Sequence, residues 1–397
     1  MQGEPRFLPF LNSITPMGDA MTRARTMGID RRYLKAILLA SLCLWVLFPS
    51  YASADSPGAA RLPALAEALR VVQPITFCGD MVPLSRQKVR EGLERELLLS
   101  LWNQPQVLLW LKRSRRYLPY IEQMLAEHDM PDDLKYVAII ESDLRPHAGS
   151  RKGAVGFWQF MKGTGRKYGL VITSDIDERR NFFASTEAAL RHFRALHVLF
   201  GSWTLAAAAY NMGEAGLMAE ILEQETRDYY HLYLPLETQH YIFRILSVKL
   251  ILRDPAAYGF TLSDSDYYPP LTFDRVRVTC PQRMPLRIIA RAAQTTFKTI
   301  KELNPEIRGY SLPRGEYSVL VPQGASRGFQ VRYDHALKHL STDGKKRIYI
   351  VKRGDNLSSI AEKFGIPLPL LIMWNRVDIS RPIYPGDRLV IYPQNRS

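Results

Sequence analysis

Cysteine is scarce in this sequence, and its scarcity excludes two classes of protein. The 397 residues include three cysteines, too few for a small scaffold built on disulfides. No Cys-x-x-Cys pair and no neighbouring histidine cluster is present, so we expect neither a structural zinc site nor any other metal or cofactor. Cys78 and Cys280 could pair in an oxidising compartment, but two free thiols agree equally well with their separation in the sequence.

Acidic residues are also few. The chain has 39 Asp and Glu against 53 Lys and Arg, a net charge of +14. Such an excess favours an anionic partner such as a polymer, a membrane surface or nucleic acid, and does not distinguish among them. With 46% hydrophobic and 23% charged residues, the composition excludes global disorder and leaves room for two or three globular domains.

An apolar run long enough to span a bilayer is missing near the N-terminus. The run Ala36–Phe48 is shorter than the roughly twenty residues that a spanning helix needs. A basic segment, residues 31–35, precedes it, and Ala52-Ser53-Ala54 follows as a cleavage signal. We therefore predict that residues 1–54 are a signal peptide or leader and that the protein is exported. A retained anchor is the alternative; a lipid anchor is not expected, because no cysteine stands directly at the cleavage point.

The mature chain divides into a helical part and a repeated part. Residues 55–128 are predicted to form a helical extension, because apolar residues recur there at spacings of three and four. A stretch rich in Pro, Tyr, Asp and Ser at 255–274 marks the boundary. Beyond it, a shift of 71 residues aligns two copies of one module without a gap. Aligned pairs include Ile289/Ile360, Asn304/Asn375, Gly315/Gly386 and Val319/Val390.

Each copy has the pattern of a small module of strand, helix, helix and strand. We place the first copy at 272–322 and the second at 347–394. The residues between them, 323–346, are rich in Gly, Ser and basic residues, and we predict a flexible linker there. The fold class expected for the whole chain is mainly α.

One carboxylate is a strong candidate for chemistry. A Pro-Asp-Asp start and a later Arg-Pro step predict a helix over residues 133–144. Glu141 falls on its apolar stripe, together with Leu134, Val137 and Ala138. Desolvation there would raise the pKa of Glu141 and keep it protonated as a proton donor, as cleavage of a glycosidic bond requires. The alternative is a surface ion pair with Arg145, four residues on.

A glycine-rich segment follows this helix. Residues 149–169 contain six glycines, and Phe157, Trp158 and Phe160 lie among them beside Gln159. Aromatic faces and an amide in a glycine-lined groove suit sugar rings. The phosphate-loop and dinucleotide motifs are missing, so we predict a saccharide site and not a phosphate site.

Three motifs in order resemble the catalytic domain of the soluble lytic transglycosylases, a lysozyme-like family that acts on peptidoglycan. They are Glu-Ser at 141–142 followed by GAVGFWQF, then AAAYNMG at 207–213 and ETQHYIFRI at 237–245. The resemblance implies a lysozyme-like catalytic domain over residues 129–260. The second repeat resembles a LysM module strongly and the first weakly, which implies binding of N-acetylglucosamine chains.

The resemblance also implies roles for individual residues. Glu141 is the single acid and base, which protonates the oxygen between N-acetylmuramic acid and N-acetylglucosamine. It then takes the proton of the muramic C6 hydroxyl, which closes onto C1 to give a 1,6-anhydro end without water. Implied substrate-binding residues are Ser142, Trp158, Gln159, Tyr210, Asn211 and Tyr241. Implied LysM glycan-binding residues are Gly354, Asp355, Asn356, Leu357, Ile383, Tyr384 and Pro385.

We therefore expect an exported peptidoglycan lytic transglycosylase of the periplasm or cell envelope, held on glycan strands by LysM. Nucleic acid is not an expected partner, whereas the basic surface also suits contact with a membrane. Two alternatives stay open: a hydrolytic lysozyme or chitinase-like enzyme, and a peptidoglycan-binding protein without activity. The first repeat lacks the Gly-Asp-Asn-Leu turn of the second, so its own ligand is not defined.

Overall fold

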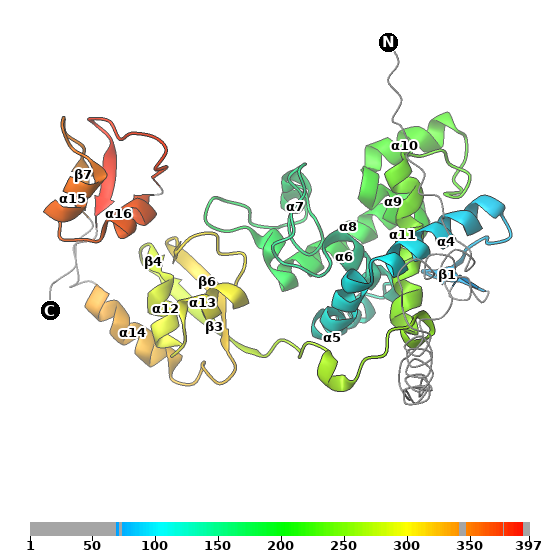
Figure 1. The fold of residues 1–397 in the computed structure, drawn as a ribbon, viewed down its shortest axis with the longest axis horizontal. Coiled ribbons are helices and arrows are strands. Elements are labelled where there is room, and N and C mark those ends of the chain that lie inside the picture. Colours follow the sequence, from blue (N-terminus) through cyan, green and yellow to red (C-terminus); the bar gives the residue numbers. More distant parts are fainter. Residues whose placement is uncertain (1–68, 71–73, 341–346, 376, 392–397) are drawn as a thin grey trace, which may run out of the picture. The chain divides into compact units, whose positions relative to one another are not determined.

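The computed structural model describes residues 69–70, 74–340, 347–375 and 377–391 (Figure 1). The chain divides into two units, Met1–Arg61 and Leu62–Ser397, and all described residues belong to the second. The predicted leader, 1–54, lies outside the described residues. Within them, no single helix is both long and apolar enough to cross a bilayer, although one sharply bent pair, Leu357–Lys363 with Leu368–Asn375, meets that test together.

In the N-terminal two thirds of the described chain, the regular secondary structure is almost all helical (Figure 1). It begins with a short hairpin, β1 (Thr76–Phe77) and β2 (Asp80–Met81). The helices that follow are α4 (Gln87–Trp102), α5 (Gln104–Glu127), α6 (Lys135–Ser142), α7 (Lys162–Lys167), α8 (Phe182–Phe200), α9 (Trp203–Met212), α10 (Glu214–Glu223) and α11 (Leu236–Arg253). The mainly α prediction is confirmed.

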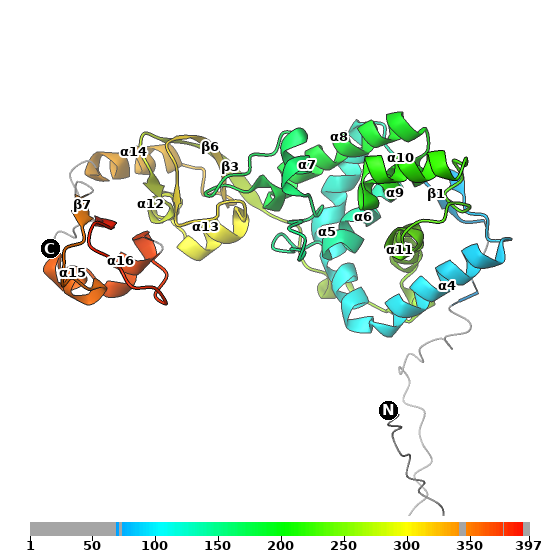
Figure 2. The same cartoon turned by 90° about the horizontal axis from the view of Figure 1, so that it is seen from above.

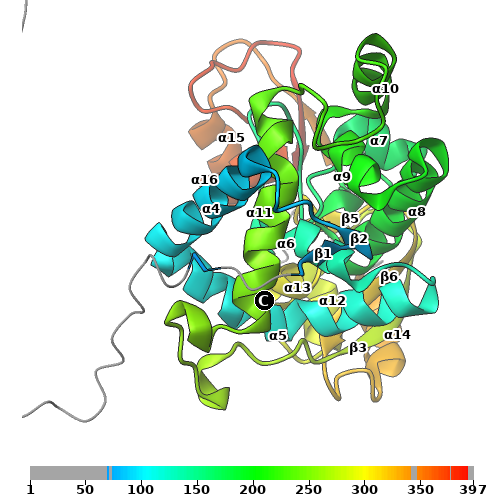
Figure 3. The same cartoon turned by 90° about the vertical axis from the view of Figure 1, so that its right-hand side faces the viewer.

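Helix α11 is the central element of this part. It packs against α4, α6 and α9, and Figure 2 views it nearly end-on with these helices and α5 around it. Figure 3 shows it from the side, with α4 along one flank and α9 along the other. Residues Thr204–Ala209 of α9 are all buried; because four of them are alanine, the neighbouring helices can approach closely.

Local signals in the sequence set the ends of α8 and α9. The Asn181 side chain accepts a hydrogen bond from the Ala184 amide at the start of α8, and Ser202 does the same for Leu205 at the start of α9. Gly201, between the two helices, has a φ of 73°, which favours glycine. Asparagine and serine are preferred at such N-terminal caps.

The predicted helical extension shares its core with helices of the predicted catalytic domain. Ile121 and Leu125 of α5 are buried in one cluster with Val137 of α6. The segment that leads out of this domain lies along α5, where Arg115 pairs with Asp264 at 2.8 Å and the Tyr268 amide donates to the Lys112 carbonyl. The extension therefore packs as an integral part of the domain that contains α6 and α11.

The first repeat has the predicted strand, helix, helix and strand. Its elements are β3 (Phe273–Cys280), β4 (Met284–Pro285), α12 (Leu286–Ala292), α13 (Phe297–Leu303), β5 (Ser311–Leu312), β6 (Gly315–Pro322) and α14 (Phe329–Leu340). β3 and β6 pair antiparallel from Phe273↔Pro322 to Cys280↔Gly315. We call residues 272–340 the first module.

The prediction of a flexible linker over 323–346 is wrong for residues 329–340, which form α14. Phe329 and Tyr333 of this helix are buried in the core of the first module. Apolar residues at 329, 333, 336 and 337 have helical spacing, a signal that the Gly, Ser and basic residues around it obscured. The first module therefore extends well past residue 322.

The second repeat, residues 347–391, is called the second module. It consists of β7 (Arg347–Ile350), α15 (Leu357–Lys363), α16 (Leu368–Asn375) and β8 (Arg388–Ile391), and β7 pairs antiparallel with β8. Its own small core is built around Ile360, Leu371 and Ile391. The strand-helix-helix-strand order predicted from the repeat is found here as well.

A buried asparagine performs the same task in both modules. Asn304 bonds through its amide to the Leu320 amide and carbonyl, and Asn375 does so to Val390, with donor–acceptor distances of 2.6–2.9 Å. Each side chain thereby pairs with the open edge of a two-stranded sheet. Leu320 and Val390 are thus equivalent, so the ungapped alignment of Val319 with Val390 is displaced by one residue.

Candidate active site

Glu141 lies near the C-terminal end of α6, as the helix prediction required. Leu134, Val137 and Ala138 are fully buried beneath it, so the apolar stripe is confirmed. Helix α6 ends directly afterwards because Asp143 takes a left-handed conformation with a φ of 55°. The side chain of Glu141 is thereby held at the edge of the core, partly buried.

Tyr241 of α11 contacts Glu141 directly. Its hydroxyl donates to Glu141 Oε1 at 2.6 Å, while its ring is only 2% exposed. Burial raises the pKa of Glu141 to about 7, against the opposing effects of the Tyr241 hydrogen bond and the positive charge of Arg244. A carboxyl group with this pKa is substantially protonated near neutral pH and can act as a general acid.

The alternative of a surface ion pair with Arg145 is wrong. Arg145 pairs with Asp143 at 3.2 Å, and its Nε donates to the Ser142 carbonyl. The turn after α6 points Arg145 away from the α6 face that a regular helix would have given it. Glu141 is thus left with a neutral hydroxyl as its hydrogen-bond partner.

Tyr210, at the C-terminal end of α9, belongs to the same cluster. Its ring stacks on Phe193 with 4.4 Å between centroids, and its hydroxyl donates to the Trp158 carbonyl at 2.6 Å. Burial, and then the charge of Glu141, raises the pKa of Tyr210 well above its ordinary value. Tyr210 is therefore a neutral hydroxyl close to the acid.

Asn211 follows Tyr210 and is oriented by a residue that the sequence interpretation missed. Thr238 Oγ1 donates to Asn211 Oδ1 at 2.8 Å, which leaves the two Nδ2 donors of Asn211 without a partner in the described part of the chain. Thr238 is 1% exposed, and its carbonyl accepts from the Tyr229 hydroxyl at 2.7 Å. The signal was present, since Thr238 lies within ETQHYIFRI and precedes Tyr241 by three residues.

Gln159 takes an uncommon backbone conformation, with a φ of 46°. Its Nε2 donates to the Gly156 carbonyl at 2.8 Å, so the amide is held against its own loop and remains partly exposed. At Gly156 the φ is 87°, and a Cβ would lie 1.7 Å from the Arg179 carbonyl oxygen. The glycine here permits a close backbone approach, and Gln159 remains a candidate for substrate contact.

The prediction that Ser142 and Trp158 bind substrate is wrong, because both side chains are buried. Trp158 is 0% exposed and donates from Nε1 to Thr186 Oγ1 at 3.1 Å, and Ser142 is 2% exposed and donates to the Ala138 carbonyl at 3.0 Å. Phe157 and Phe160 are buried too. These aromatic side chains fill the core because the glycine-rich segment folds back onto α5 and α8, which its local sequence does not specify.

The predicted LysM positions form two adjacent turns in the second module. Asp355 accepts from the Tyr349 hydroxyl and the Lys352 amide, both at 2.7 Å, while Asn356 caps α15. Backbone bonds from Gly386 to Val351 and back from Val351 to Asp387 join the two turns. Tyr384 and Pro385 are exposed, and Leu357 and Ile383 are partly buried. Their role in glycan binding stays a prediction.

Metal-ligating groups do not gather in this site. Among the described residues, no three His, Cys, Asp or Glu side chains are placed to hold one metal ion. Cys78 and Cys280 are both free thiols. The sequence left open whether they pair, and in the structure they do not.

Comparison with family models identifies three domains. The transglycosylase SLT domain matches residues 119–233, the LysM-like domain described for lytic transglycosylase MltD matches 272–337, and the LysM domain matches 349–391. The SLT match contains Glu141 and Tyr210, and it ends before α11. The predicted resemblance to soluble lytic transglycosylases with LysM modules is confirmed.

The chain is also similar to two curated proteins and to one solved structure. Membrane-bound lytic murein transglycosylase D of Escherichia coli strain K12 is 33% identical over 293 residues, which cover 70% of this chain and 64% of the relative. Its counterpart from an O6:H1 strain gives the same figures. The chain thus spans less than two thirds of these relatives. The 70-kDa soluble lytic transglycosylase of Escherichia coli is 18% identical over 44% of this chain and 32% of that chain, with a TM-score of 0.33, too low to establish a shared fold.

Proposed function

Because the chain joins a transglycosylase SLT domain to a LysM-like domain and a LysM domain, we propose that it is a peptidoglycan lytic transglycosylase. It cleaves the β-1,4 bond between N-acetylmuramic acid and N-acetylglucosamine and leaves a 1,6-anhydro end. The observation that carries the proposal is the partly buried Glu141, whose pKa of about 7 suits a group that must both give and take a proton.

Glu141 performs both proton transfers. Its carboxyl proton goes to the bridging oxygen as the bond from that oxygen to muramic C1 breaks. The resulting carboxylate then accepts the proton of the muramic C6 hydroxyl, while the C6 oxygen forms a bond to C1. The hydroxyl of Tyr241, 2.6 Å from Glu141 Oε1, stabilises the carboxylate between these two steps.

Tyr210 and Asn211 bind and orient the sugar. The Nδ2 donors of Asn211 suit an acetamido carbonyl or a ring hydroxyl, because Thr238 already occupies Oδ1. The Gln159 amide lies on the segment that follows α6 and offers a further polar contact. Ser142 and Trp158 have no direct contact with substrate in this proposal, since both side chains are buried.

The hydrolytic alternative would require a second carboxylate that activates water or acts as a nucleophile. Glu237, on the first turn of α11, is the acidic neighbour whose charge also raises the pKa of Glu141. Its side chain is exposed and makes no hydrogen bond to Glu141 in the described structure. The single-acid mechanism is therefore favoured.

We place the protein in the cell envelope, where its substrate is found. Residues 1–54 direct its export, and the second module holds the enzyme on glycan strands through the turns at 354–357 and 383–385. The positive net charge supports contact with an anionic wall or membrane surface. Protein partners are not assigned.

Mass spectrometry of the soluble products from peptidoglycan sacculi tests this function. We expect anhydromuropeptides from the wild-type protein and none from Glu141→Gln, whereas Glu237→Gln retains them. Products that carry an added water would assign a hydrolase. If no product forms while the protein still sediments with sacculi, the protein is a peptidoglycan-binding protein.

A further inference from the structure

The first module carries an excess of positive charge. The matched segment 272–337 has 11 Lys and Arg against 5 Asp and Glu, whereas the SLT segment 119–233 has 12 against 16. The SLT segment is therefore acidic, whereas the matched segment of the first module is basic. A local excess of this size points to an anionic ligand for the module itself.

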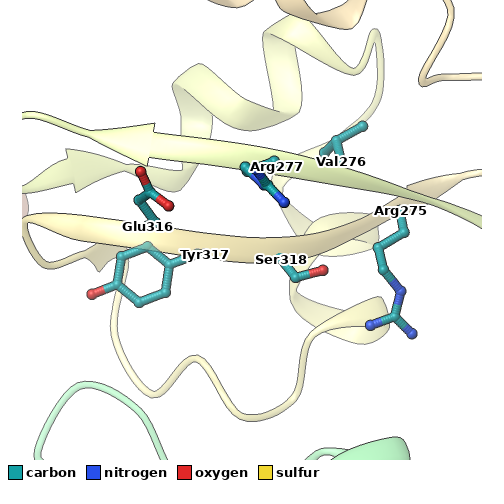
Figure 4. A pocket seen from close by; sticks show the side chains of 6 residues that line it. All are labelled: Arg275, Val276, Arg277, Glu316, Tyr317 and Ser318. Carbon is teal, nitrogen blue, oxygen red and sulfur yellow. The ribbon is translucent and has the colours of Figure 1, made fainter.

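The open face of the β3–β6 ribbon carries a groove of about 460 Å³ (Figure 4). It is lined by Arg275, Val276, Arg277, Glu316, Tyr317 and Ser318. Arg277 and Ser318 are directly opposite each other in the strand register, and Arg275 precedes Arg277 by two residues on the same face. Two guanidinium groups, the Ser318 hydroxyl and the Glu316 carboxylate thus share the exposed face, whereas Tyr317 is opposite the buried Val278 and packs against the core of the module.

Both arginines keep hydrogen-bond donors for a ligand. In the described part of the chain neither one has a carboxylate within ion-pair distance, whereas Arg283 of the same module pairs with Asp175 at 2.8 Å. Arg275 lies over the Phe183 ring at 5.3 Å, a contact that holds the side chain without using its N–H groups. Because Phe183 belongs to α8, one end of the groove borders the catalytic domain.

We propose that this groove binds the carboxylate groups of the peptide stems on peptidoglycan strands. The inference rests on the proposed function, which brings stem-bearing strands to the protein. Two arginines on one strand face are about 7 Å apart, a spacing that two carboxylates of a short peptide can match. Each guanidinium can bind a carboxylate through paired N–H donors, and the hydroxyl of Ser318, opposite Arg277 in the register, offers the peptide a further hydrogen bond.

An anionic membrane is the competing ligand for a basic surface. Stable binding to a bilayer surface normally adds apolar side chains that insert between the lipids. The exposed large apolar residues of the described first module are Tyr310 and Val331, and neither lines the groove. The groove therefore fits a peptide better than a lipid surface.

The test compares two double variants with the same change in charge. Arg275→Gln with Arg277→Gln removes the groove cations, and Arg287→Gln with Arg291→Gln removes two exposed cations on α12. Stem peptide released from sacculi by an amidase is titrated into each full-length protein, and the dissociation constant is measured by calorimetry. We expect affinity to fall about tenfold or more for the groove variant and to stay unchanged for the control.

Activity provides a second, separate readout. On intact sacculi the groove variant should show a higher KM with unchanged kcat, and on glycan stripped of its stems it should match the wild type. Equal losses on both substrates, equal losses in both double variants, or weaker binding to anionic vesicles with unchanged binding of stem peptide would overturn the proposal. If the wild type cleaves no glycan, the lytic function fails, while calorimetry still decides the groove.

Discussion

The hydroxyl of Tyr241 on α11 donates to Oε1 of Glu141 on α6 at 2.6 Å, across 100 residues of sequence. Two opposite effects meet at this carboxyl group. Burial raises its pKa, and the Tyr241 hydrogen bond lowers it by stabilising the ionised form. The balance, a pKa of about 7, is suited to an acid that must become a base within one turnover.

Replacing Tyr241 should move the pH dependence of the reaction. The proposed mechanism starts from protonated Glu141, so activity falls as the pH rises through the pKa of that group. Tyr241→Phe removes a bond that favours the carboxylate; hence the pKa rises and the alkaline limb of kcat/KM shifts to higher pH. The pH–rate profile checks this, with Tyr258→Phe as a control outside the site. A limb that stays in place or shifts to lower pH would contradict it.

Ionisation of Glu141 should lower the stability of the folded protein. Its pKa rises from an ordinary value of 4.5 to about 7 on folding, so the folded state favours the protonated form. Stability is therefore full below pH 4.5 and declines as the pH rises toward 7, by up to about 3 kcal/mol. Glu141→Gln removes this loss. In urea unfolding, Glu141→Gln should therefore stabilise the protein much more at pH 8 than at pH 5; the same stabilisation at both pH values would refute the explanation.

The contribution of Thr238 to activity should come from its hydroxyl alone. Thr238→Val keeps the shape but removes the donor to Asn211 Oδ1, so the amide can rotate and kcat/KM should fall about tenfold. Thr238→Ser keeps the donor and should retain most of the activity. The Tyr229 hydrogen bond uses the backbone carbonyl and survives in both. Steady-state kinetics on sacculi check this. Similar losses of kcat/KM in Thr238→Val and Thr238→Ser would show that packing, and not the hydrogen bond, is responsible.

Asn304, the buried asparagine of the first module, should stabilise the edge of strand β6. Asn304→Ala removes the amide that bonds to both the amide and the carbonyl of Leu320, and leaves these buried groups unpaired. Local stability should fall by about 2–4 kcal/mol, seen as faster hydrogen exchange along β6. Lys298→Ala, on the exposed face of α13, is the matched control. Unchanged exchange in the asparagine variant would mean that the edge is held by other contacts.

Much of the site was predictable because its signals are local or recur in a fixed order. The apolar spacing that placed Glu141 on a buried stripe depends on residues within two turns of one helix. The three motifs located Tyr210, Asn211 and Tyr241, and the repeat of Asn304 at Asn375 revealed two modules. Helical periodicity, capping residues and repeats are properties of the sequence itself, so they can be recognised before any packing is known.

Tertiary structure alone decided which of these side chains meet and which are buried. Trp158 and Ser142 lie inside because a glycine-rich segment folds back onto α5 and α8, and Thr238 orients Asn211 because α9 and α11 cross there. The local sequence of a loop does not determine which of its side chains are exposed, because exposure depends on segments that are distant in sequence. The sequence therefore determined the candidate acid and the modules, while non-local packing determined the hydrogen bonds that tune and position them.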